Sequence, residues 1–193
     1  MTFNAILESA ERLFARDGFE ASSTTKIAEF AGVSVGSLYE YFPSKDALVA
    51  QLLKRHCDRM LEQFARAFFA SSGRGIEEVA GALVDAAHAA YAIDVRLHRV
   101  LLEQMGRVSK PHHMSRVSLA IVDLLEKALI ECGEVIQRPG TRLAAFMVES
   151  VVESLMQRSI QYAPEVFEAD LREELKVMVT LYLRTSPSSP KQS

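Results

Sequence analysis

The segment from Ser22 to Lys45, SSTTKIAEFAGVSVGSLYEYFPSK, constrains the fold more than any other part of this chain. It predicts a short helix over residues 24–31 followed by a tight turn. A serine at position 22 or 23 can cap this helix, because a hydroxyl accepts a hydrogen bond from the unpaired N–H groups of the first turn. Gly32 follows the last apolar position, where a residue in the left-handed conformation readily ends a helix.

The second helix of this pair, expected over residues 35–42, has equally clear bounds. Ser34 can cap its first turn. Pro43 ends it, because the residue before a proline is biased out of helical geometry. Two short helices joined by a turn of three or four residues that contains glycine form a helix-turn-helix unit, whose second helix enters the major groove of DNA. The pattern therefore predicts nucleic-acid binding.

The residues before this pair predict another helix, ending at Asp17 and Gly18, that completes a small three-helix core. Its apolar residues fall on one helical stripe, which consists of Ile6, Leu7, Ala10, Leu13 and Phe14. The helix-turn-helix pair supplies the opposing apolar positions, which are Ile27, Ala31, Val33, Leu38 and Phe42.

The run GFEASSTTKIAEFAGVSVGSLYEYFPSKDAL resembles the DNA-binding signature of the TetR family of transcriptional regulators. The matching positions are Gly18, Phe19, Ile27, Ala28, Ala31, Gly32, Val33, Ser34, Gly36, Leu38, Tyr39, Phe42 and Lys45. The strong match ends at Leu48, and the remainder matches in length and helical character. The resemblance implies a bacterial-type regulator, a repressor, that binds a pseudo-palindromic double-stranded DNA operator as a homodimer and is released by a small apolar or amphipathic effector.

The resemblance also implies which side chains meet the DNA. Val35 and Glu40 occupy positions that vary in the signature, so we expect Val35 to contact a thymine methyl group and Glu40 to accept from a cytosine amino group. The expected major-groove residues are Val35, Gly36, Ser37, Tyr39 and Glu40, which follow Ser34 at the start of the helix. Phosphate contacts are expected mainly from Thr24, Thr25, Lys26, Tyr41 and Lys45.

The charge of this segment is opposite to that of a usual DNA-binding domain, which is basic. Residues 1–48 contain four lysines and arginines against seven aspartates and glutamates, a net charge of −3. Most of the acids lie on the first helix or at Glu29, which can face away from the groove surface. We expect modest non-specific affinity, because that affinity depends on the number of phosphates neutralised.

The rest of the chain predicts only helices, so the expected fold class is all-α. A long helix over residues 45–69 lacks proline and glycine, and further helices are expected over 76–92, 94–106, 114–132, 141–162 and 170–183. A loop that includes His112 and His113 is expected around Pro111. The predicted domains are a helix-turn-helix domain over 1–48, a helical ligand-binding and dimerisation domain over 49–185, and a disordered tail over 186–193.

The last helix is apolar nearly all round, and the apolar residues of the preceding helix cover more than one stripe, so each is expected to be buried on more than one side. The TetR resemblance implies that they pair across a two-fold axis as a four-helix bundle; the alternative is that they pack only within their own subunit. The expected interface residues are Val148, Val151, Val152, Leu155, Leu171, Leu175, Met178 and Tyr182.

A small-molecule site is expected among the middle helices, since apolar and aromatic walls with a few polar groups are typical of such sites. We expect His88, Tyr91 and His98 to supply the polar groups. The walls are expected from Met60, Phe64, Leu102, Met105, Val117, Ile121, Phe146 and Met147. All of these residues also have ordinary core spacing, so a close-packed core is the alternative.

The sequence shows no catalytic or metal-binding constellation, so we expect no enzymatic activity, no metal and no cofactor. Cys57 and Cys132 have neither metal-site nor disulfide spacing. Glu149 and Glu153 lie four residues apart on one helical face, which a solvated or buried polar stripe explains equally well. Without a signal-peptide pattern or a long apolar run, the expected location is cytoplasmic. An alternative function is a TetR-like DNA-binding protein controlled by a protein partner, or one without an effector.

Overall fold

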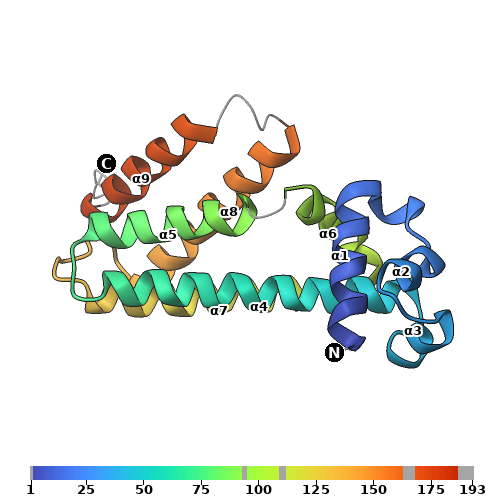
Figure 1. Ribbon diagram of the computed structural model, residues 1–193. Coiled ribbons are helices and arrows are strands. Elements are labelled where there is room, and N and C mark those ends of the chain that lie inside the picture. The colour runs from blue at the N-terminus through green and yellow to red at the C-terminus, as the bar shows by residue number, and fades with distance from the viewer. Residues whose placement is uncertain (1, 93–94, 109–111, 163–167, 187–193) are drawn as a thin grey trace. The chain divides into compact units, whose positions relative to one another are not determined.

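The computed structural model describes residues 2–92, 95–108, 112–162 and 168–186 (Figure 1). Within these ranges the chain forms nine helices and no strand, which confirms the predicted all-α class. The helices are α1 (Thr2–Ala21), α2 (Thr24–Phe30), α3 (Val35–Tyr41), α4 (Lys45–Ser71), α5 (Ile76–Ala92), α6 (Val95–Val108), α7 (His112–Glu131), α8 (Thr141–Tyr162) and α9 (Glu168–Arg184). The predicted tail lies outside the described residues except for Ser186.

The helices fall into two compact units. The first unit consists of Met1–Asp58 and Ile93–His113, and the second unit consists of Arg59–Ala92 and Met114–Ser193. Helix α4 contributes its first half to the first unit and its second half to the second. The first unit also includes α6, which the sequence did not place there. The predicted domain bounds at residues 48 and 49 stay a prediction.

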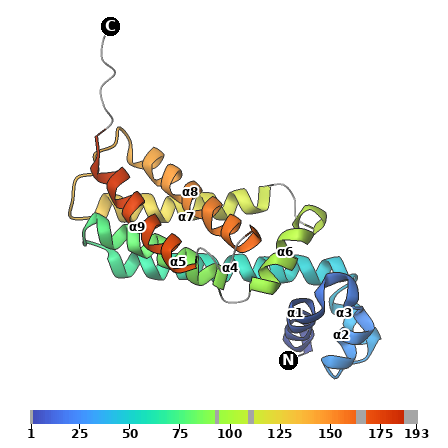
Figure 2. The ribbon, with the colours of Figure 1, turned by 90° about the horizontal axis from the view of Figure 1, so that it is seen from above.

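In the first unit, α1 packs against α2 and α6, and α2 packs against α3 (Figure 2). Gly18 interrupts the helical geometry of α1, with a φ of 81° and a ψ of 169°. This is where the sequence predicted the end of the first helix. Ser23 caps α2 by accepting a hydrogen bond from the Lys26 amide at 3.2 Å. The turn after α2 contains Gly32 with a φ of 68°. These local features orient α2 and α3 over the buried core of α1.

Phe19 is the point where three helices of the first unit meet. Its ring is buried and packs against Phe14, with ring centroids 5.7 Å apart. The Lys45 ammonium, at the start of α4, donates to the Phe19 carbonyl at 2.7 Å and lies 3.9 Å from the centre of its ring. The Arg107 guanidinium of α6 lies 5.3 Å from the same ring centre. Phe19 therefore links α1 to α4 and α6.

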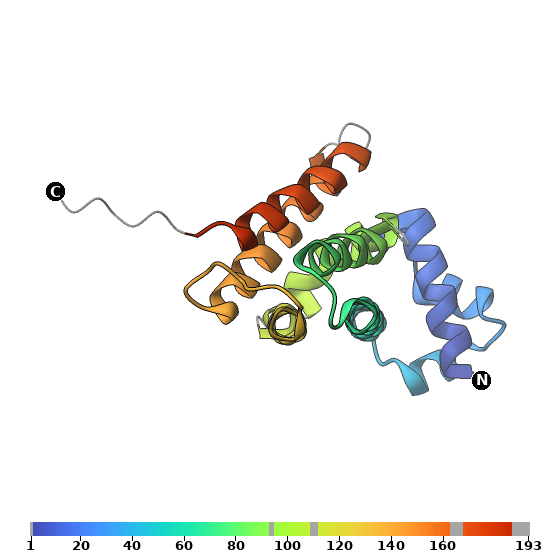
Figure 3. The same cartoon turned by 90° about the vertical axis from the view of Figure 1, so that its left-hand side faces the viewer.

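In the second unit, α5 packs against α8 and α9, and α8 packs against α9 (Figure 3). Helix α7 begins at His112, so the predicted loop was wrong at His112 and His113. The reason is that a proline is compatible with the first turn of a helix, and Pro111 therefore does not require a loop after it. No helix in the described part of the chain is both long and apolar enough to cross a membrane.

We predict that Gly18→Ala lowers the free energy of unfolding by about 1–3 kcal/mol, because the Gly18 dihedral angles are accessible almost only to glycine. Urea unfolding at fixed protein concentration measures the change. Gly81→Ala is the matched control: Gly81 lies within α5, and an added Cβ there would meet nothing within 4 Å. That substitution is expected to stabilise by about 0.5–1 kcal/mol. Equal effects of the two substitutions would contradict the role given to Gly18.

Candidate nucleic-acid interface and candidate ligand cavity

Helix α3 presents one buried and several exposed side chains. Leu38 is fully buried and anchors the helix, whereas Val35, Tyr39 and Tyr41 are 38%, 47% and 48% exposed. The remaining predicted groove residues are on the same short helix, with Gly36 and Glu40 exposed and Ser37 half-buried. The structure thus brings the five expected base-contact residues together on one element that reaches the surface.

Hydrogen bonds hold the hydroxyl groups of this surface in place. The Ser34 hydroxyl caps α3 by accepting from the Ser37 amide at 3.0 Å. The Thr24 and Tyr39 hydroxyls share a hydrogen bond of 3.0 Å, which joins the start of α2 to α3. Thr25 is exposed beside Thr24. Because Tyr39 is already restrained, less side-chain entropy would be lost when it meets DNA.

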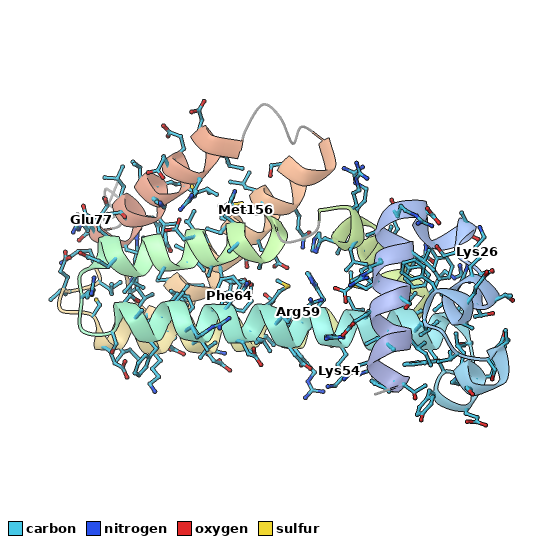
Figure 4. The ribbon with its side chains drawn as sticks, viewed as in Figure 1. Lys26, Lys54, Arg59, Phe64, Glu77 and Met156 are labelled. Carbon is cyan, nitrogen blue, oxygen red and sulfur yellow. The ribbon has the colours of Figure 1, made fainter. Side chains whose placement is uncertain are left out.

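The two expected phosphate-binding lysines are engaged within the protein. The Lys26 ammonium, labelled on α2 in Figure 4, donates to the Ala21 carbonyl at 3.2 Å. The Lys45 ammonium donates to the Phe19 carbonyl, as described above. A phosphate would have to share or replace these carbonyl partners. Sequence reasoning identified the two lysines but not their partners, because both partners are backbone oxygens.

We predict that Lys45→Ala weakens binding to all DNA sequences by a similar factor and lowers the slope of log affinity against log salt by about one. The substitution also removes the bond to Phe19, so unfolding must be followed in parallel. Lys54→Ala is the control, since Lys54 is an exposed lysine of the same helix that pairs with Asp58 at 3.1 Å. Fluorescence anisotropy over a salt series measures the slope. Unchanged affinity of Lys45→Ala at low salt would contradict a phosphate contact.

The second unit contains a small cavity between α4, α5, α7 and α8. Its volume is about 20 Å³, which is enough for roughly one water molecule. Most of its wall is apolar, and Figure 4 shows Phe64 on the side of α4 that faces α5. The lining residues are Met60, Phe64, Leu83, Ala87, Val117, Ser118, Ile121, Glu149, Val152 and Glu153.

The structure brings together only part of the predicted ligand set. Met60, Phe64, Val117 and Ile121 line the cavity. The other predicted residues do not line it. Three of them belong to α6 in the first unit, namely His98, Leu102 and Met105. His88 is half-buried on α5, Phe146 and Met147 are exposed on α8, and the Tyr91 side chain lies outside the described residues. Sequence reasoning did not assign Leu83, Ala87, Ser118, Glu149, Val152 and Glu153 to a ligand site.

His98 has a partner within the first unit. Its Nδ1 lies 3.0 Å from the His56 Nε2, so one imidazole donates a hydrogen bond to the other. Burial, and then the nearby His56, lower the pKa of His98 to about 4. His98 is therefore neutral near pH 7, which suits a buried hydrogen-bonding role between α4 and α6.

Glu149 is a buried acidic residue in the lining of the cavity. Its side chain is only 3% exposed, and the Ser118 hydroxyl donates to its Oε1 at 2.8 Å. Burial raises the pKa of Glu149 to about 7, although the Ser118 hydrogen bond opposes this rise. Burial also raises the pKa of Glu153, one helical turn away. A serine can stabilise a carboxylate by hydrogen bonding but cannot neutralise its charge.

We predict that Glu149→Gln becomes more stable relative to the wild type as pH rises. Unfolded Glu149 ionises near pH 4.5 and folded Glu149 only near pH 7, so the folded state retains the proton and loses stability across that window. Glutamine cannot ionise, so the variant should gain about 2–3 kcal/mol at pH 8 that is absent at pH 4.5. Urea unfolding at several pH values measures this, with the exposed Glu62→Gln on α4 as control. A difference independent of pH would contradict the burial of the charge.

Helices α8 and α9 expose an apolar surface. It flanks an apolar groove of about 90 Å³ lined by Met147, Val148, Val151, Met178, Val179 and Tyr182. Other exposed apolar side chains lie on the same two helices, namely Leu143, Phe146, Val177 and Leu181. Of the predicted interface residues, Val148, Val152 and Leu175 are buried inside the subunit, Met178 is exposed, and Val151, Leu155, Leu171 and Tyr182 are half-buried.

No group of three or more His, Cys, Asp or Glu side chains with metal-binding geometry occurs among the residues that the structure describes. The features present are a helix-turn-helix surface in the first unit, and a cavity and an exposed apolar face in the second. A helix-turn-helix surface of this kind defines a DNA-binding protein of the transcriptional-regulator class.

Comparisons with known proteins give the family. Residues 6–52 match the model described as bacterial regulatory proteins, tetR family, and residues 76–183 match the tetracyclin repressor-like C-terminal domain, which is more than half of the chain. The chain therefore belongs to the TetR family of transcriptional regulators. Members of this family are non-enzymatic proteins that bind operator DNA and usually dimerise.

Individual relatives match over shorter stretches. The transcriptional repressor KstR2 of Rhodococcus jostii is 34% identical over 114 residues, which covers 54% of this chain and 55% of the relative. The transcriptional regulator YuxN of Bacillus subtilis is 41% identical over 54 residues, which covers 28% of this chain and 19% of the relative. The chain thus spans between 19% and 55% of the length of these curated relatives.

Solved structures match over nearly the whole chain and show the fold. A transcriptional regulator from Rhodococcus sp. RHA1 has a TM-score of 0.72 and 21% identity, covering 97% of this chain and 100% of that one. A structure reported for the control of antibiotic production by bacterial hormones also has a TM-score of 0.72, with 23% identity over 95% of this chain and 98% of that one.

Proposed function

We propose that this protein is a homodimeric repressor that leaves its operator when a small apolar or amphipathic molecule binds the second unit. The observation that carries the proposal is the course of α4. Met60 and Phe64 of this helix line the cavity, and Lys45 at its first residue contacts Phe19 in the DNA-binding unit. A ligand that repositions α4 would therefore act on the helix-turn-helix. The relative KstR2 is a transcriptional repressor, which supports repression rather than activation.

Release of DNA in this scheme is a shift between two conformations. In a dimer, the two α3 helices enter successive major grooves about 34–36 Å apart. A ligand weakens this binding only if it binds more tightly to a conformation with another spacing of the two helices. Val35 and Glu40 would read the bases in each half-site, whereas the ligand acts from the second unit.

The cavity must enlarge to accept a ligand, because its volume of about 20 Å³ holds no organic molecule. Met60 can change rotamer readily, since an unbranched side chain with three rotatable bonds adapts to different shapes. The same small volume favours the alternative function, in which DNA binding is controlled by a protein partner or is not controlled by any effector. Ligand binding itself must therefore be tested.

A screen of apolar and amphipathic compounds by thermal shift, followed by anisotropy with operator DNA, tests ligand control. The proposal predicts that at least one compound raises the melting temperature and weakens operator binding by about tenfold or more. Compounds that stabilise the protein without releasing DNA would contradict ligand-controlled repression. A complete absence of stabilising compounds would support the alternative function.

Dimerisation is expected through the apolar face of α8 and α9. Val151 and Met178 both line the groove between these helices and retain some exposure, so aspartate at both positions should be compatible with folding of the subunit. In the dimer the two charges would be buried without partners, at a cost of several kcal/mol by order of magnitude. We predict that the double variant V151D/M178D is a folded monomer in analytical ultracentrifugation.

Phe69→Asp is the control for this double variant. Phe69 is 85% exposed near the end of α4 and does not line the groove, so this variant should remain dimeric. Circular dichroism shows whether each variant is folded. A wild-type protein that sediments as a monomer at micromolar concentration would contradict dimerisation.

A further inference from the structure

The cavity of the second unit contains acidic groups, and its described lining includes no basic side chain. Its polar lining consists of Ser118, Glu149 and Glu153, and none of its described lining residues is lysine, arginine or histidine. Glu149 is 97% buried, since its exposed fraction is 3%. A buried charge is normally paired, because removing an ion from water costs several kcal/mol by order of magnitude. When ionised, Glu149 is therefore a buried charge that the described lining of the cavity does not neutralise.

The hydrogen bonds of these carboxylates hold them in position without neutralising them. Ser118 donates to the Glu149 Oε1 at 2.8 Å, and the Ser150 hydroxyl lies 3.5 Å from the Oε2. The Gln157 amide donates to the Glu153 Oε1 at 3.3 Å. All of these donors are neutral. Both glutamates are therefore held on α8, with capacity to accept further hydrogen bonds.

We propose that the cavity, once enlarged as described above, binds an organic cation, whose ammonium group pairs with the Glu149 carboxylate and whose hydrocarbon part contacts the apolar wall. The inference rests on the proposed effector role of the second unit and specifies the chemical class of the effector. Met60, Leu83 and Ile121 provide apolar contact surface. Phe64 adds an aromatic ring, and the face of such a ring attracts cations.

The charge of the site discriminates among ligands. An anionic ligand would be repelled by Glu149 and Glu153, and a neutral ligand would leave an ionised Glu149 uncompensated. A cation stabilises the carboxylate and so lowers the pKa that burial has raised. Glu153 is the other titratable group among the described lining residues, and it has the same sign. Cation affinity should therefore fall below about pH 7, where Glu149 takes up a proton.

The test uses three probes of equal chain length: octylamine, octanol and octanoate. Isothermal titration calorimetry with the full chain at about pH 8 measures each affinity. The proposal predicts that octylamine binds at least about tenfold more tightly than octanol, and that octanoate binds most weakly. Equal affinities for the amine and the alcohol, or no binding of octylamine, would overturn it.

Variants assign the effect to the cavity. Glu149→Gln keeps the size of the side chain and should lower the affinity for octylamine by about tenfold or more while leaving octanol affinity unchanged or higher. Glu62→Gln, an exposed glutamate on α4, should change neither affinity. Circular dichroism verifies folding. Octylamine affinity that is the same in the wild type and Glu149→Gln, with both folded, would overturn the proposal.

Measuring the affinity for operator DNA with each probe present distinguishes failure of the cation site from failure of the proposed function. Octylamine that binds through Glu149 but leaves the DNA affinity unchanged would support the cation site and contradict ligand-controlled repression by that ligand class. Octanol that releases the DNA as effectively as octylamine would support ligand-controlled repression and overturn the cation site.

Discussion

A contact between Phe19 and Lys45 joins the two ends of the segment that contains α2 and α3. Gly18 turns the chain out of the straight part of α1, so that the Phe19 ring enters the core while its carbonyl accepts from Lys45 at 2.7 Å. The two ends of the helix-turn-helix segment are thereby joined, which reduces the conformational freedom of the residues between them. This contact acts together with the buried Leu38 and the Thr24–Tyr39 hydrogen bond in holding α3 in place, and the same lysine begins the helix that continues into the second unit.

Helix α8 has two faces with different chemistry. On one face, Glu149 and Glu153 contribute carboxylates to a cavity; on another, Met147 and Val151 line the apolar groove that α8 forms with α9. A helix with an apolar exposed face requires a partner to bury it, and a buried carboxylate requires a compensating charge. In the proposed dimer, α8 both pairs with the other subunit and carries the carboxylates of the cavity. Ligand binding and subunit pairing would therefore influence each other.

Local chemistry explains which features could be predicted. The helix-turn-helix follows from caps, a left-handed glycine and a proline, because each acts within a few residues; Ser23, Gly32 and Ser34 have the expected roles. The full lining of the cavity could not be predicted, because helical periodicity shows which side of a helix is buried but not which other helices pack against that side. The spacing therefore predicted His98 as a polar group of the ligand site, although His98 pairs with His56 in the first unit. The spacing of Glu149 and Glu153 was visible, but their burial was not.

Selection of bound DNA from a random pool is the sharpest test of base reading by α3, because it reports both DNA binding and the role of this helix. We expect enrichment of an inverted repeat whose half-sites are separated by about one or more turns of the double helix. We also expect that changing the exposed Val35 to Asn alters the preferred base at the same position in both half-sites. An unenriched pool, or an identical selected sequence for the wild type and Val35→Asn, would contradict sequence reading by this helix.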